Sequence, residues 1–126
     1  MMYVYTISEQ TVAAAAPIEF TTIGVSKCRS TSQATETTLI IGCPGIYEIT
    51  FNGTATAAGT AQLYVNGEEI DGAVSTGTTL IFTALIQVNP NCCAVTNNLP
   101  ARIQVINDGA AALTLTNVAL TIIKVG

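Results

Sequence analysis

Apolar and polar residues alternate in short segments along the whole chain, and turn residues separate these segments. About nine such segments occur, each with the period of two that is typical of a half-buried β-strand. They cover residues 3–7, 18–25, 38–41, 46–54, 61–65, 68–74, 78–88, 101–106 and 113–125. The pattern predicts an all-β sandwich or barrel rather than a fold of alternating strands and helices.

Residues 46–54 form the clearest predicted strand. One face holds Tyr47, Ile49 and Phe51, and the other holds Glu48, Thr50 and Asn52. After the next segment, the dipeptide Asn66-Gly67 supplies two residues that tolerate positive φ, as a type I′ hairpin turn requires. We therefore expect residues 68–74 to return antiparallel to residues 61–65.

The composition predicts that part of the exterior is buried against other chains. Only 10% of the 126 residues are charged, against about 25% in a typical soluble domain, while 49% are hydrophobic. The net charge is −4, and the four basic residues are scattered except for Lys27 and Arg29. Nucleic acids and anionic membranes are poor partners for such a surface, because both require clustered basic residues.

The first 16 residues stand apart as a candidate extended arm ahead of a domain at residues 17–126. This segment has no basic start and no apolar run long enough for a signal peptide or a membrane span. We expect the chain to be assembled without secretion. The arm is predicted to dock on another protein by adding a strand to a sheet edge.

Four motifs, in this order, resemble a known family: PGIYEITFN at 44–52, LYVNG at 63–67, VINDG at 105–109 and LTIIKV at 120–125. The sequence is similar to bacterial and phage relatives of the tumour necrosis factor (TNF) and complement globular-head domains. The resemblance implies a two-sheet antiparallel jelly-roll sandwich that forms a homotrimer around an apolar axis. The resemblance covers residues 17–126. This sequence has no counterpart of the collagen-like stalk found in the complement and spore-surface members.

The trimer axis that the resemblance implies needs apolar residues on the outer face of long strands. We select Ile81, Leu85 and Ile123 for this role. The selection depends on the register, because a shift of one residue would turn all three side chains to the other face.

The residue types argue against an enzyme. The chain has no His, which removes the commonest general base and the commonest metal ligand. Its nearest acidic cluster, Glu68, Glu69 and Asp71, follows the Asn66-Gly67 turn, and its spacing fits no calcium loop. We interpret this cluster as the solvated end of a hairpin, and we expect no catalytic residue, cofactor or metal.

The four cysteines allow three interpretations, which the sequence leaves open. They lie at predicted strand ends: Cys28, Cys43, Cys92 and Cys93. The even count permits disulfides, with a Cys28–Cys43 pair as the simplest arrangement. Four free thiols suit a protein that stays in a reducing cytosol, and a zinc site requires the ligands to converge in space.

These observations and the resemblance predict a non-enzymatic structural protein, most specifically a bacteriophage head fibre or decoration protein on the virion surface. We expect such a protein to be assembled in the bacterial cytoplasm and to dock on a capsid or another structural protein through residues 1–16. An alternative is a module that binds a host-surface glycan through the loops at 72–79 and 89–98. A second alternative is a spore or cell-surface coat protein. The aromatic residues Tyr3, Tyr5, Tyr47 and Tyr64 suit either a carbohydrate surface or packing, and we expect packing.

Overall fold

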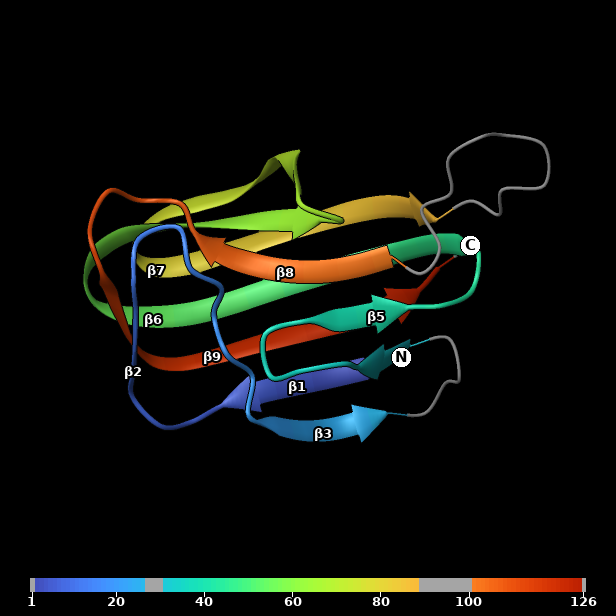
Figure 1. The fold of residues 1–126 in the computed structure, drawn as a ribbon, viewed down its shortest axis with the longest axis horizontal. Coiled ribbons are helices and arrows are strands. Elements are labelled where there is room, and N and C mark those ends of the chain that lie inside the picture. The colour runs from blue at the N-terminus through green and yellow to red at the C-terminus, as the bar shows by residue number, and fades with distance from the viewer. Residues whose placement is uncertain (1, 27–30, 89–100, 126) are drawn as a thin grey trace.

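A computed structural model describes residues 2–26, 31–88 and 101–125, and in these ranges the chain is all-β (Figure 1). The strands are β1 (Met2–Thr6), β2 (Gln10–Val12), β3 (Thr22–Ser26), β4 (Thr31–Gln33), β5 (Leu39–Ile41), β6 (Gly45–Val65), β7 (Glu68–Val88), β8 (Ala101–Asn107) and β9 (Leu113–Lys124). No helix in the described ranges is long and apolar enough to cross a bilayer. The predicted all-β class is therefore confirmed.

Two layers of strands, which we call sheet I and sheet II, make up the sandwich. Sheet I has the order β3-β1-β9-β6-β7 and uses residues 45–54 of β6 and 79–88 of β7. Sheet II has the order β4-β5-β8-β6-β7 and uses residues 59–65 of β6 and 68–77 of β7. Every pairing is antiparallel, as the sequence predicts for a jelly roll.

The long strands β6 and β7 connect the two sheets, and each replaces two strands expected from the sequence. Their pairing slips between Thr54 and Gly59, where the chain leaves sheet I for sheet II. Figure 1 shows both strands curving at the end of the sandwich opposite the chain termini. The small residues of this stretch permit the bend without ending the strand. A Cβ at Gly59 would overlap the side chain of Leu113, so close packing requires glycine here.

The core lies between the sheets and follows the predicted alternation. Tyr47, Ile49 and Phe51 of β6 are fully buried, while Ile103 and Val105 face them from sheet II. Aromatic rings meet at the centre, where Phe51 stacks on Phe82 at 5.3 Å between centroids and meets Phe20 edge to face at 6.3 Å. The core therefore fixes which side chains of sheet I point outward.

The N-terminal segment is part of the sandwich, which corrects the expectation of an arm at residues 1–16. Strand β1 lies between β3 and β9, and β2 pairs with β9. Met2, Val4 and Val12 are buried in the core. These residues fold back because burial removes their alternate apolar side chains from water. Docking by strand addition through this segment would therefore require it to leave the sandwich.

The local turn prediction is confirmed, while one predicted strand is shorter than expected. Asn66 and Gly67 have φ values of 53° and 84°, as a type I′ turn requires. In the predicted strand at 18–25, only the part from Thr22 pairs as a strand, within β3. The preceding residues Ile18 and Phe20 are buried, and their N–H groups donate to the carbonyls of Val105 and Glu36.

Candidate functional site

The outward face of sheet I is the most distinctive surface of the described residues. Side chains that alternate with the buried core residues form three rows across its strands. The first row contains Tyr3, Thr121, Thr50 and Thr83; the second contains Tyr5, Ala119, Asn52 and Ile81; the third contains Ile123, Glu48 and Leu85. Ile46 and Gln87 extend the face at one end. We call this set the sheet I face.

Apolar side chains on the sheet I face are unusually exposed. Leu85 is 64% exposed, Ile81 58%, Ile46 39% and Tyr3 37%. The remaining members are mainly Thr, Ala and Asn, and Glu48 is the one charged residue in the set. Exposed apolar side chains that gather on one face of a soluble protein often mark a contact with another protein. The face therefore has the chemistry of a protein–protein contact.

The structure places all three candidate axis residues on this one face. Leu85 and Ile123 lie on opposite sides of Glu48 in the same row, and Ile81 lies on β7 with Thr83 between it and Leu85 on the same face. The sequence analysis did not select Ile46, Tyr3 or Tyr5, although the period of two already implied a shared outward direction for the two tyrosines. Tyr3 and Tyr5 lie 5.4 Å apart between ring centroids. Whether the face lies on a trimer axis stays a prediction.

Sheet II carries the polar counterpart of this surface. Arg102 and Gln104 point outward from β8, and Tyr64 points outward from β6. The Tyr64 hydroxyl lies 3.0 Å from Glu69 Oε1 and 3.1 Å from Asp108 Oδ1. Donation to Glu69 and Asp108, together with their negative charges and desolvation, raises the pKa of Tyr64 to about 12. The charged residues Arg102, Glu69 and Asp108 therefore lie away from the sheet I face.

The acidic cluster does not form a metal site in the described part of the chain. Among the three acids Glu68, Glu69 and Asp71, Glu69 alone accepts a hydrogen bond from the Tyr64 hydroxyl. No group of three or more potential Cys, Asp or Glu ligands is arranged to hold a metal ion among the described residues. The cluster lies at the hairpin that follows Asn66-Gly67, where the sequence interpretation placed a solvated hairpin end.

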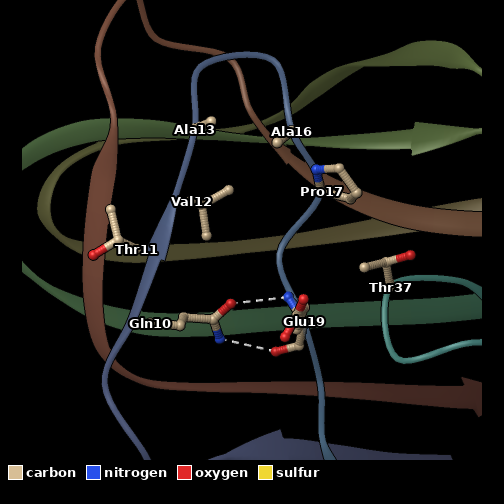
Figure 2. Close-up of a pocket in the computed structure, with 8 residues that line it drawn as sticks. All are labelled: Gln10, Thr11, Val12, Ala13, Ala16, Pro17, Glu19 and Thr37. Atoms are coloured by element: carbon tan, nitrogen blue, oxygen red, sulfur yellow. Dashed lines mark hydrogen bonds between the residues drawn. The ribbon is translucent and has the colours of Figure 1, made fainter.

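The hollow in Figure 2 lies between the N-terminal segment and the chain that follows it. Its volume is about 270 Å³, and it is lined by Gln10, Thr11, Val12, Ala13, Ala16, Pro17, Glu19 and Thr37. The Gln10 side chain donates to the Glu19 carbonyl at 2.9 Å and accepts from the Glu19 N–H at 3.0 Å. This amide is therefore used to hold the N-terminal segment against the chain that follows it.

The structure addresses only part of the cysteine and loop predictions. Cys43 is exposed, and its carbonyl accepts a hydrogen bond of 2.9 Å from the Tyr47 hydroxyl. Cys28, Cys92, Cys93 and the predicted loop at 89–98 lie outside the described residues. The other predicted loop, at 72–79, was wrong because these residues belong to β7 and lie largely in register with β6.

Comparisons with known proteins identify the fold. No family model matches the sequence, and no curated protein sequence is significantly similar to it. Among solved structures, rabbit GITRL superposes with a TM-score of 0.61 at 12% identity, covering 100% of this chain and 95% of that one. Murine APRIL gives a TM-score of 0.58 at 10% identity, covering 94% of this chain and 97% of that one. The chain therefore has the TNF-like jelly-roll fold that its motifs predicted.

Proposed function

We propose that this protein is a non-enzymatic structural protein that assembles as a homotrimer through the sheet I face. The observation that carries the proposal is the combination of high exposure and near absence of charge on that face. Leu85 and Ile81 alone are 64% and 58% exposed. Each large apolar side chain removed from water contributes about 1.5–3 kcal/mol. The homotrimer that the family resemblance implies provides the occupant, a neighbouring copy of the same chain.

The two ends of the sheet I face differ in shape, which suits a cyclic assembly. In a trimer of identical chains, each contact joins two different patches of the surface. Strand β7 carries the protruding side chains Ile81 and Leu85 at the edge of the sheet. The β1 end has a hollow of about 250 Å³ whose lining includes Tyr3, Tyr5 and Asn52. One copy can therefore place its β7 edge against the hollow of the next.

We further propose that the trimer is displayed on a particle surface, as a head fibre or decoration protein of a bacteriophage virion. The support is the resemblance of the four sequence motifs to bacterial and phage relatives of the TNF and complement domains, together with the low charge content. Because β1 and β2 are used in the sandwich, attachment to a capsid would use a surface of the folded domain rather than a free N-terminal arm. Mass spectrometry of purified particles tests this role, and absence of the chain from intact virions would contradict it.

Substitution of one exposed side chain tests the trimer. Leu85→Lys removes an apolar contact and places a charge in each of three interfaces. Because Leu85 is 64% exposed in the single chain, the burial that is lost is about two thirds of the full contribution, or about 3–6 kcal/mol per trimer, which lowers the association constant roughly 10²- to 10⁴-fold. Light scattering should therefore report separated chains at micromolar concentration.

Val74→Lys is the matched control for this substitution. Val74 lies on the same strand and is 43% exposed, but it belongs to the sheet II part of β7 and lies outside the sheet I face. This variant should keep the wild-type mass. If Leu85→Lys also keeps the wild-type mass, the sheet I face is not the contact between copies.

A further inference from the structure

Glu48 is out of place chemically on the sheet I face. Its side chain is half-buried in the third row, between Leu85 on β7 and Ile123 on β9. Along its own strand it is flanked by Ile46 and Thr50, which point to the same side. Within the described residues, no hydrogen bond or ion pair involves its carboxylate. The other residues of the face are apolar or uncharged polar, so their chemistry does not account for a carboxylate at this position.

No charged group of the neighbouring strands faces Glu48. From β7 the facing residues are Thr83, Leu85 and Gln87, and from β9 they are Thr121 and Ile123, none of which titrates. Lys124 is the nearest basic residue on β9, but it is in register with Tyr47 and therefore belongs to the opposite side of the sheet. A second copy that presents the same face brings no basic residue of that face, and Lys27 and Arg29 lie outside the described residues.

Contact between copies through this face would remove the Glu48 carboxylate from water without providing a counter-charge. A carboxylate in that position is destabilising unless it binds a proton and becomes neutral. We propose that Glu48 couples homotrimer assembly to proton uptake, so that the trimer tightens as the pH falls. The inference rests on the proposed homotrimer and adds a pH-dependent control to it.

The sign and size of the effect follow from linkage. If the trimer binds one more proton per copy than the separated chains do, its association constant rises as the pH falls. Three protons per trimer give a change of up to about a thousandfold per pH unit. The chain concentration at which half of the trimer dissociates then changes by up to about 30-fold per pH unit, since that concentration varies as the square root of the dissociation constant.

The experiment measures dissociation on dilution from pH 5 to pH 8, by light scattering, for the full chain and for Glu48→Gln. We expect the wild-type half-dissociation concentration to rise with pH. For Glu48→Gln it should stay nearly constant and lie below the wild-type value at pH 8, because a neutral amide replaces the carboxylate. Glu48→Leu provides a second variant with the same expected loss of pH dependence.

Glu36→Gln is the matched control, because Glu36 is an exposed acid in the β4–β5 loop, away from the sheet I face. It should keep the wild-type pH dependence. A trimer whose wild-type dissociation does not vary with pH would overturn the inference while leaving the proposed function intact. A trimer that Glu48→Gln weakens at pH 8 would also overturn it, since the carboxylate would then be accepting a bond from another copy. A protein that is monomeric at every pH would refute the homotrimer itself.

Discussion

The buried side chain of Asn107 offers the sharpest test of how the N-terminal segment is held. This residue is fully buried at the end of β8. Its Nδ2 donates to the carbonyls of Val12 at 3.0 Å, Ala13 at 3.3 Å and Ala111 at 2.9 Å. Its Oδ1 accepts from the Gly109 N–H at 3.1 Å. One amide therefore joins the N-terminal segment to the β8–β9 turn.

Asn107→Ala leaves these backbone groups without their partner. The bond to the Val12 carbonyl is fully buried, so its loss costs about 1–3 kcal/mol, and the partly buried bonds add about 0.5–1.5 kcal/mol each where water does not replace them. We expect a total loss of about 2–6 kcal/mol. Urea unfolding should show a lower midpoint with an unchanged m-value. Asn107→Asp should be worse at neutral pH, because a carboxylate cannot donate to carbonyl oxygens.

Ser8→Ala serves as the control, since Ser8 is exposed in the same N-terminal segment and makes no side-chain hydrogen bond among the described residues. Its effect should stay within about 0.5 kcal/mol. If Asn107→Ala shifts the urea midpoint no more than Ser8→Ala does, the buried amide does not hold the segment and the reasoning fails.

Two further predictions concern the Tyr64 hydroxyl and the N-terminal strands. The folded chain holds the Tyr64 proton up to a pKa of about 12, against an ordinary value of 10.0, so the free energy of unfolding should fall between these pH values. Urea unfolding of Tyr64→Phe should show a smaller decrease than the wild type over this range, and an unchanged pH profile would contradict the assignment. Deletion of residues 1–12 removes Met2, Val4 and Val12 from the core at about 1.5–3 kcal/mol each, a loss comparable to the whole stability of a domain. Circular dichroism should show loss of cooperative unfolding, whereas an unchanged transition would mean that the segment is a dispensable arm.

Local pattern was enough to predict the strands with strict alternation. In β6, Tyr47, Ile49 and Phe51 are apolar at every second position, and burial follows the same period in the structure. The Asn66-Gly67 turn was predictable for a similar reason, because few residues adopt positive φ without strain. Such features depend on neighbours in the chain and can be recognised from a short window.

Long-range pairing was not predictable in the same way. The segment at 3–7 was expected as a strand, but its place beside β9 depends on residues more than 100 positions away, such as Ala119, which pairs with Tyr5. The continuity of β6 was also missed, because small residues between Thr54 and Gly59 are equally typical of a turn and of a bend between sheets. The tertiary packing decides between these outcomes.

The sequence predicted that a contact surface exists, but it did not predict all of the residues that form it. Low charge content predicted a contact surface, and the period of two placed Ile81 and Leu85 on one side of their strand. The complete face also contains Tyr3 of β1 and Ile46 of β6, and these join it only because the sheet order brings β1, β9, β6 and β7 side by side. The position of Glu48 between Leu85 and Ile123 required the cross-strand register.

Native mass tests the central claim most directly. Light scattering on the purified full chain at neutral pH and micromolar concentration, with and without reductant, measures the number of copies that associate. Our account predicts a mass near three times the 13.0 kDa of one chain, unchanged by reductant because the contact is non-covalent. A stable mass near 13.0 kDa at that concentration would contradict the account, because the sheet I face would then remain in water.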